Sequence, residues 1–295
     1  MSVNQLPTAP LELARLNTAQ RQQLRDKASG IRLVYFDIDG TLLNSKAELP
    51  DSAIAQIQRI QRLGIKTAVA SGRPIFAAQP LIDQLSLNSA GLFYTGAVLY
   101  HPAKKNTLRS QALASDDVRG IIAIARREQL HCELYTIDNY YIEHATAYTD
   151  FHSHYLKREP IVQDFTDALI AQGIYKIQLV VHENEEIAKL NAVQAAFPEL
   201  VYATGHGADR PEIIFSSVVS AAADKVQAFE YLLDYHGLVA EQVMSLGDAG
   251  SDQVFLQQAG LGIAMGNATD AVKQYANYIT EHVDNDGLAA ALGLL

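Results

Sequence analysis

Short apolar segments alternate with longer amphipathic segments along most of the chain. An apolar run such as Leu33-Val34-Tyr35-Phe36 is too short for a membrane span and is typical of a strand buried on both faces. The amphipathic segments have the spacing and end signals of helices. Strands are expected at 31–37, 65–70, 91–94, 242–246 and 261–264, and helices at 51–63, 74–86, 224–236, 251–258 and 269–276. This alternation predicts an α/β fold with a doubly wound, mainly parallel sheet.

The pattern changes between residues 104 and 213, where adjacent strand pairs mix with helices. Strands are expected there at 131–136, 140–144, 174–181, 200–203 and 211–215, and helices at 115–129, 164–171 and 184–196. Such a mixture is typical of an antiparallel α+β domain. We therefore expect a core built from 31–103 and 214–295, with the inserted domain 104–213 sitting on it as a lid.

Residues 1–30 form an N-terminal arm of polar, helix-favouring composition, with Thr18 as the expected N-cap of a helix at 19–28. The sequence leaves open whether this arm packs on the core, joins an oligomer contact or is partly disordered. It also leaves open whether the protein is a monomer or a homodimer.

The composition narrows the classes of partner. A formal charge of −10 argues against nucleic acid or an anionic membrane as the main partner, but it allows a small anion at a site with a metal ion. Cys132 is the single cysteine, and its setting favours a small buried core residue over a nucleophile. No segment approaches the roughly 20 apolar residues of a membrane helix, and the N-terminus lacks the features of a signal peptide. We expect a cytoplasmic protein.

Four polar clusters stand at or beside the expected ends of the core strands, where open parallel sheets bind ligands. They are Asp37/Asp39/Thr41, Ser71/Gly72/Arg73, Lys225 at a helix start, and the segment 247–252. Taken alone, each has an ordinary interpretation as a turn, a strand–helix junction or a solvated lysine. Together they supply acids, a hydroxyl, a cation and backbone amides on one rim. Because Asp37 and Asp39 are two residues apart, their like charges point to one side of the chain, and a divalent cation would compensate them.

These clusters resemble the motifs of the haloacid dehalogenase superfamily of phosphohydrolases that use an aspartate nucleophile. The matching segments are Asp37-Ile38-Asp39-Gly40-Thr41-Leu42, Ser71-Gly72-Arg73, Lys225 and Gly247-Asp248-Ala249-Gly250-Ser251-Asp252. The 23-residue separation of Lys225 from Asp248, the tail 262–268 and the closing segment 286–289 are similar to the Cof-type branch. The resemblance covers about residues 31–295 and implies a Rossmann-like core with a C2-type α+β cap.

The resemblance implies a Mg²⁺-dependent phosphatase that hydrolyses a small phosphorylated metabolite, such as a sugar phosphate or a cofactor-type monoester. Asp37 would form an aspartyl-phosphate, and Asp39 would act as general acid and then general base. Asp37, the Asp39 carbonyl and Asp248 would bind Mg²⁺, with Asp252 in or beside the shell. The groups expected to bind phosphate or substrate are Ile38, Ser71, Gly72, Arg73, Ser251 and Lys225, which would also offset negative charge.

The chain departs from the family pattern at several positions. Ser251 stands where Asn is usual, Val226 follows the motif lysine in place of Gly, and Thr95 replaces Asn in the segment after the third strand. Two alternatives therefore stay open: a phosphotransferase or phosphomutase on the same scaffold, and a weakly active metabolite-binding protein.

Some residues of the inserted domain carry other hypotheses. His144, His152 and His154 could suggest zinc, but their loose spacing favours solvated or substrate-facing histidines. The segment 205–210 is expected to be a turn between strands, with His206 and Arg210 as candidates for substrate selection.

Overall fold

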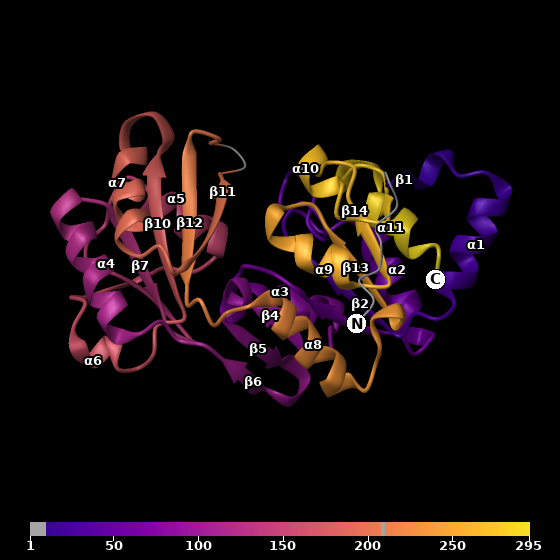
Figure 1. The fold of residues 1–295 in the computed structure, drawn as a ribbon, viewed down its shortest axis with the longest axis horizontal. Coiled ribbons are helices and arrows are strands. Elements are labelled where there is room, and N and C mark those ends of the chain that lie inside the picture. Colours follow the sequence, from indigo (N-terminus) through magenta and orange to yellow (C-terminus); the bar gives the residue numbers. More distant parts are fainter. Residues whose placement is uncertain (1–9, 208–209) are drawn as a thin grey trace.

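The computed structural model of this protein describes residues 10–207 and 210–295. Two sheets, each with six strands among the described residues, are joined by a smaller three-stranded sheet (Figure 1). The strands are β1 (Leu11–Glu12), β2 (Leu33–Phe36), β3 (Lys66–Val69), β4 (Gly91–Phe93), β5 (Val98–His101), β6 (Asn106–Ser110), β7 (His131–Tyr135), β8 (Tyr140–Ile142), β9 (Ile161–Val162), β10 (Lys176–His182), β11 (Val201–His206), β12 (Ile213–Val219), β13 (Val243–Gly247), β14 (Leu261–Ala264) and β15 (Tyr278–Ile279). The α-helices are α1 (Thr18–Ala28), α2 (Asp51–Arg62), α3 (Ile75–Leu85), α4 (Ser115–Glu128), α5 (Thr149–Leu156), α6 (Asp167–Ile170), α7 (Glu183–Ala196), α8 (Lys225–His236), α9 (Gln253–Gln258), α10 (Asp270–Lys273) and α11 (Gly287–Leu292).

The core sheet has the order β1-β15-β14-β13-β2-β3, and all its pairs are parallel. Strand β2 lies inside it and is buried on both faces, as its apolar sequence predicts. Val34 and Phe36 join a hydrophobic cluster that includes residues of α2, α3 and α11. Tyr35 packs edge-on against Phe255 of α9 on the opposite face. Helices therefore cover both faces, which confirms the doubly wound α/β core.

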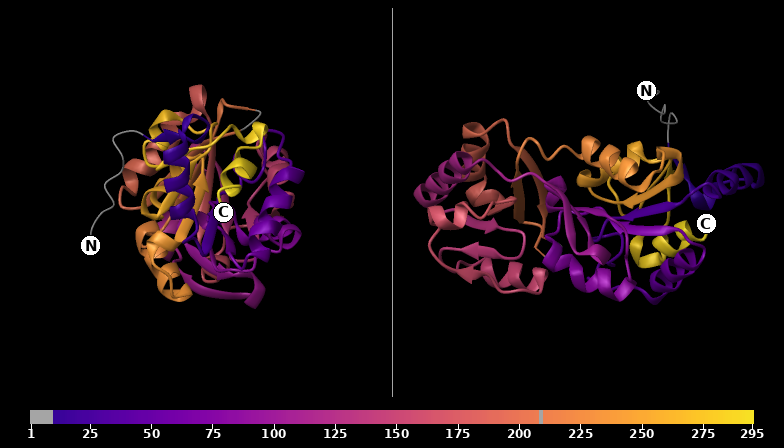
Figure 2. Two further views of the ribbon diagram at one scale, coloured as in Figure 1. Left: turned by 90° about the vertical axis from the view of Figure 1, so that its right-hand side faces the viewer. Right: turned by 90° about the horizontal axis from the view of Figure 1, so that it is seen from below.

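The second large sheet has the order β11-β12-β10-β7-β8-β9 and is antiparallel except for its β8–β9 pair. Residues of β10 pack with residues of α4 and α7 in a separate hydrophobic cluster. Figures 1 and 2 show α4 and α7 on the side of this sheet that faces away from the core. The expected α+β character of the insert is confirmed, and its sheet continues through β12 to Val219, past the expected boundary at 213.

The sequence did not predict the hairpin of β5 and β6. These strands form an antiparallel sheet with β4, which meets β3 through a bridge between Ala70 and Leu92. Residues 104–110, expected in the insert, therefore belong to a hairpin attached to the core. Helices α5 and α11 were also not predicted, and the helix expected at 164–171 is reduced to α6.

The N-terminal arm packs on the core from residue 10 onward. Strand β1 pairs with β15, and Leu24 of α1 is fully buried in the core cluster. The N-cap of α1 is Asn17 and not Thr18, because Asn17 and Gln20 form a reciprocal capping box. The part of the arm at residues 1–9 lies outside the described residues.

Candidate active site

Three neighbouring strands of the core sheet bring the polar clusters together. Strands β13, β2 and β3 are parallel and in register, with Leu246 opposite Phe36 and Phe36 opposite Val69. Their carboxyl ends therefore meet at one edge of the sheet. Asp37, Ser71 and Asp248 follow these ends, as the motif positions predict.

Asp37, Asp248 and Asp252 form an acidic cluster, in which one carboxylate oxygen from each residue lies within 4.8 Å of the others. Asp37 and Asp252 are buried. Burial, followed by the charges of the other aspartates, raises the pKa of Asp37 well above its ordinary value. Burial and Asp252 raise the pKa of Asp248 to about 7. Oxygen ligands crowded in this way fit a divalent cation, because the cation removes the repulsion that they otherwise share.

Two glycines let the carboxylates of the acidic cluster approach the chain. At Gly40, which has a φ of +75°, a Cβ atom would lie 2.3 Å from Oδ2 of Asp248. At Gly247 a Cβ atom would lie 2.5 Å from the Cβ of Asp252. Any larger residue at either position would push an aspartate out of place.

Neutral side chains orient Asp248. Thr41 donates to its Oδ1 at 3.2 Å, and the amide of Asn267 donates to its Oδ2 at 3.1 Å and to the carbonyl of Gly40 at 2.9 Å. The sequence did not predict a role for Asn267. The one sequence feature that could have indicated this role is the position of Asn267 shortly after strand β14, at the same edge of the sheet as the acidic motifs.

Lys225 reaches the acidic cluster from the start of α8. Its ammonium donates to the carbonyl of Ser251, while the Ser251 hydroxyl donates to Oδ1 of Asp252 at 3.1 Å. Burial lowers the pKa of Lys225, and the charges of Asp252 and Asp37 oppose that shift. Because the lysine contact uses the backbone of residue 251, it does not need the Asn side chain that is usual there.

The position of Lys225 is set by the return segment 220–224, which joins β12 of the inserted sheet to α8. Asp224 closes this segment and caps the helix, accepting from the backbone amides of Val226 and Gln227 at 2.7 and 3.0 Å. The lysine is thus the first helical residue after the chain returns from the insert.

Ile38, Ser71 and Gly72 lie at the same rim. A backbone hydrogen bond from Ile38 opposes the upward shift in the pKa of Asp37. Ser71 is buried, and its hydroxyl accepts from the amide of Arg73 at 3.4 Å. A Cβ atom at Gly72 would lie 3.3 Å from Oγ1 of Thr95, so the residue that replaces the usual Asn packs directly on this loop.

Arg73 binds the other motif acid. Its Nε and Nη2 lie 2.9 and 2.6 Å from the two carboxylate oxygens of Asp39, in a bidentate pair. Its guanidinium also lies 4.5 Å from the ring centroid of Tyr155, which comes from α5 of the insert. Arg73 therefore connects the motif acid Asp39 with the inserted domain, a contact that the sequence did not predict.

The inserted domain makes further contacts with the core beside this loop. The Tyr94 hydroxyl donates to the carbonyls of Thr136 and Ile137 at 3.0 and 2.8 Å. Phe76 of α3 stacks with Tyr135 and Tyr140. These contacts place one face of the inserted sheet against the segment that carries Ser71, Gly72 and Arg73.

The three histidines considered for zinc lie in different settings. His144 and His154 are exposed, whereas His152 is buried and bonds to Glu133, so it is neither solvated nor a free metal ligand. Among the described residues, the acidic cluster of Asp37, Asp248 and Asp252 is the only group with metal-site geometry. His152 is one of the buried residues of α5 itself and bonds to Glu133 of β7, so the expectation of a solvated side chain was wrong for it.

His206 and Arg210 have partners at the far end of the inserted sheet. His206 lies 2.7 Å from the Pro211 carbonyl, and Arg210 pairs with Glu212 at 2.9 Å. Residues 208–209 of the expected turn lie outside the described residues. The candidacy of His206 and Arg210 for substrate selection stays a prediction.

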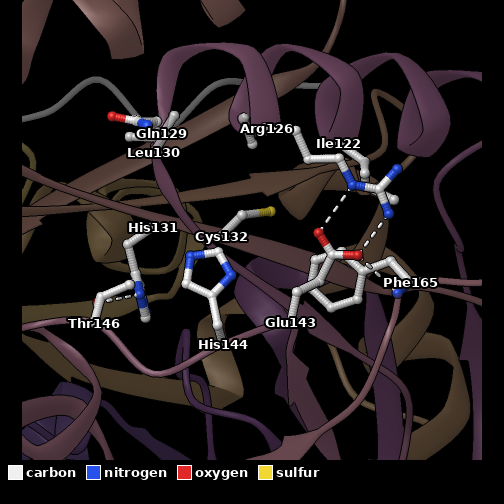
Figure 3. Close-up of a pocket in the computed structure, with 11 residues that line it drawn as sticks. Ile122, Arg126, Gln129, Leu130, His131, Cys132, Glu143, His144, Thr146 and Phe165 are labelled. Carbon is white, nitrogen blue, oxygen red and sulfur yellow. Dashed lines mark hydrogen bonds and ion pairs between the residues drawn. The ribbon is translucent and has the colours of Figure 1, made fainter.

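A separate cavity of about 320 Å³ lies on the inserted domain, beside α4 and β7 (Figure 3). Its charged residues already have partners: Arg126 holds Glu143 through two contacts of 2.9 and 2.5 Å, and His131 contacts Thr146 at 2.6 Å. Cys132 also lines it; burial raises the pKa of this thiol, in line with a core residue and not a nucleophile. The cavity therefore lacks the arrangement of groups found at the strand ends.

No α-helix in residues 10–207 and 210–295 is long and apolar enough to cross a membrane.

Comparison with known proteins agrees with this geometry. The chain is 26% identical over 263 residues to the 5-amino-6-(5-phospho-D-ribitylamino)uracil phosphatase YitU of Bacillus subtilis, covering 88% of this chain and 96% of the relative. It is 26% identical over 265 residues to the pyridoxal phosphate phosphatase YbhA of Escherichia coli, with the same coverage. The crystal structure of a haloacid dehalogenase-like hydrolase from Bacteroides thetaiotaomicron superposes with a TM-score of 0.77 at 27% identity, covering 89% of this chain and 98% of that one.

The sequence pattern of the haloacid dehalogenase-like hydrolases matches residues 34–292, nearly the whole of the core and the insert. The resemblance drawn from the motifs is thereby confirmed, together with the Rossmann-like core and its inserted cap. This chain belongs to the haloacid dehalogenase-like hydrolases, in their Cof-type branch.

Proposed function

We propose that this protein is a Mg²⁺-dependent phosphatase that hydrolyses a small phosphorylated metabolite through an aspartyl-phosphate on Asp37. The observation that carries the proposal is the buried acidic cluster of Asp37, Asp248 and Asp252 at the sheet edge, with Asp39 beside it. Buried like charges persist when a cation shares the site with them.

The proposed reaction has two displacements. In the first, a carboxylate oxygen of Asp37 forms a bond to phosphorus while the bond to the alcohol oxygen breaks, and Asp39 gives that oxygen a proton. In the second, water attacks the aspartyl-phosphate, Asp39 takes a proton from the water, and inorganic phosphate leaves with Asp37 restored. Asp39 suits this role because it is the more exposed of the two, with 38% of its side chain accessible.

Asp37, Asp248 and the Asp39 carbonyl would hold Mg²⁺, with Asp252 in or beside the shell. The ion would neutralise negative charge on the phosphoryl oxygens. Lys225 would add a second positive charge from the side of Asp252. Ser71 and the amides of Ile38 and Gly72 would donate to phosphoryl oxygens, and we keep Arg73 and Ser251 as further candidates for this group.

The proposed substrate is a sugar phosphate or a cofactor-type monoester. Support comes from the relatives, whose names describe phosphatases of a phosphoribitylamino-uracil and of pyridoxal phosphate. We also propose that the inserted domain acts as a lid that selects the alcohol portion, since it contacts the loop that carries Arg73.

The test is phosphate release from a panel of phosphorylated metabolites and p-nitrophenyl phosphate, with Mg²⁺ and with chelator. We expect metal-dependent release that Asp37→Asn lowers by about a thousandfold or more, because the nucleophile is lost. Asp26→Asn, at an exposed aspartate of α1, is the matched control. Equal activity of Asp37→Asn and the wild type would refute the proposal.

The same experiment separates the alternatives. A phosphotransferase or mutase would release little inorganic phosphate, and adding a second hydroxyl compound would yield its phosphate ester. A weakly active binding protein would release none from any ester, even though the residues of the acidic cluster are intact.

A further inference from the structure

The face of the inserted sheet that meets the core carries a row of polar residues. In the strand register, Lys176 lies opposite Tyr135, and Gln178 lies opposite both Glu133 and Ser217. Directly opposed residues of antiparallel strands point to the same face. We call these five residues, Glu133, Tyr135, Lys176, Gln178 and Ser217, the inner face. The residues that alternate with them on β10, Ile177 and Leu179, belong to the apolar cluster on the outer side.

Contacts place the inner face beside the candidate active site. The ring of Tyr135 stacks on Phe76 at 6.3 Å between centroids, and Phe76 follows Arg73 closely in the sequence. Arg73 in turn holds the carboxylate of Asp39. The end of β10 that carries Lys176 therefore lies near the part of the site where the alcohol portion of a phosphate ester would leave.

The acceptors of the inner face are already used. Glu133 is buried and binds His131 at 3.0 Å, His152 at 2.8 Å and the hydroxyl of Tyr135 at 2.6 Å. The side-chain oxygen of Gln178 accepts from the hydroxyl of Ser217 at 2.8 Å. A ligand that meets this face finds few free acceptors.

Two donors of the inner face are not used. Lys176 is 3% exposed, yet its ammonium forms no ion pair or hydrogen bond with the described residues and lies 4.4 Å from the ring centroid of Tyr135. Gln178 is also 3% exposed, and its amide nitrogen has no acceptor among the described residues. Buried polar groups normally find a partner, so two neighbouring donors without acceptors point to a group that arrives with the ligand.

We propose that Lys176 and Gln178 bind an anionic oxygen group on the alcohol portion of the substrate. The substrate class is then a phosphate monoester that carries a second carboxylate or phosphate group. This inference rests on the proposed phosphatase function and refines it. An oxygen anion fits because it accepts hydrogen bonds from both side chains and would form a direct ion pair with Lys176.

The test compares substrates that differ in this one group. The first pair is 3-phosphoglycerate, which has a carboxylate, and glycerol 3-phosphate, which has a hydroxymethyl group at that carbon. The second pair is fructose 1,6-bisphosphate and fructose 6-phosphate, which tests a second phosphate. We expect the wild type to favour the doubly anionic member of at least one pair by about tenfold or more in kcat/KM. The pair that shows the preference identifies the anion as carboxylate or phosphate.

Variants assign the preference to the inner face. Lys176→Met is expected to reduce the ratio within the pair by about tenfold, and Lys176→Arg to restore most of it, because arginine keeps the charge. The matched control is Lys189→Met on α7, whose lysine pairs with Glu186 on the outer side. If Lys176→Met does not fold, Gln178→Glu serves in its place, since an added carboxylate would repel the anion and lower the ratio.

Failure of this inference can be told apart from failure of the phosphatase function. Metal-dependent hydrolysis of p-nitrophenyl phosphate with no preference in either pair would overturn the inference and leave the phosphatase intact. If no ester is hydrolysed, calorimetric titration with the members of both pairs in chelator decides it. Tighter binding of the doubly anionic member of either pair that Lys176→Met abolishes would support the inference, and equal binding within both pairs would overturn it.

Discussion

Two buried carboxylates, Asp37 in the core and Glu133 in the inserted domain, have pKa values shifted in opposite directions. Burial raises the pKa of both groups. At Asp37 the neighbouring aspartates raise it further, and the backbone of Ile38 opposes them. At Glu133 the charges and hydrogen bonds of His152 and His131 outweigh burial, so the pKa lies well below its ordinary value.

This difference separates a reactive carboxylate from a structural one. Glu133 accepts hydrogen bonds from donors within the protein, so it fixes the positions of its neighbours and has little capacity left to bind a ligand. Asp37 stands among other acids, and a bound cation would offset the repulsion that it shares with them. Burial alone therefore does not indicate function, whereas burial with like charges does.

The comparison predicts opposite effects on stability when each group is neutralised. Glu133→Gln removes the charge that two histidines and a tyrosine share, and we expect it to lower the free energy of unfolding by about 3 kcal/mol or more. Asp248→Asn removes repulsion from the acidic cluster, so in chelator at pH 7.5 we expect it to raise the melting temperature. Thermal unfolding of both variants under these conditions is the measurement. A Glu133→Gln variant that is more stable than the wild type, or an Asp248→Asn variant that melts at a lower temperature in chelator, would contradict the distinction between a structural and a reactive carboxylate.

Arg73 tests how the two regions are joined. Lysine in its place keeps the charge but cannot form the bidentate pair with Asp39 or the planar contact with Tyr155. We expect Arg73→Lys to lower kcat/KM for p-nitrophenyl phosphate by about tenfold and to change the pH profile of kcat, because Asp39 is held differently. Arg119→Lys is the matched control, since Arg119 pairs with Asp116 and Asp167 at the surface. A rate and pH profile equal to those of the wild type would show that Asp39 does not depend on Arg73.

The smallest expected effect is the response of stability to metal and pH. A carboxyl whose folded pKa is raised stabilises the fold at low pH and loses that contribution as pH rises through the folded value. Because the pKa of Asp37 is raised and that of Asp248 is about 7, the metal-free protein should lose stability between pH 5 and 7.5. Mg²⁺ at about ten times its Kd would add about 1.4 kcal/mol, or about 2–4 °C in Tm.

We therefore expect Mg²⁺ to raise Tm more at pH 7.5 than at pH 5, measured by thermal unfolding with Mg²⁺ and with chelator. Glu133 does not change stability between pH 5 and 7.5. Its lowered pKa means that its ionised form stabilises the fold, and this contribution is lost only at pH values below the ordinary range of a carboxyl. A Mg²⁺ response that is equal at both pH values would argue that the acidic cluster is not the metal site.

The sequence predicted the core better than the inserted domain, for a physical reason. The core residues follow buried strands directly, so Asp37, Ser71 and Asp248 stand out as polar groups where an apolar run stops. Lys176 and Gln178 lie inside a strand and alternate with apolar residues, which is the ordinary pattern of a half-buried strand.

Other contacts depend on how distant segments meet. Tyr155 reaches Arg73 from α5, a helix with no clear signal in the sequence, and the bond from Lys225 uses the backbone of Ser251 and not its side chain. Thr95 takes a φ of +59°, a conformation that asparagine tolerates far better than a β-branched residue. The departures from the family pattern at Thr95 and Ser251 could be read from the sequence, but their consequences could not.

The return segment 220–224 has a consequence for anyone who wishes to exchange the inserted domain for another. The segment ends in Asp224, which caps α8, and Lys225 follows directly. The length and conformation of this connection between the two domains therefore determine the position of Lys225. A chimaera cut within this segment would alter catalysis even if the new domain folded perfectly. Donor domains should therefore be grafted on the insert side of Ser220, with the native spacing up to Lys225 kept whole.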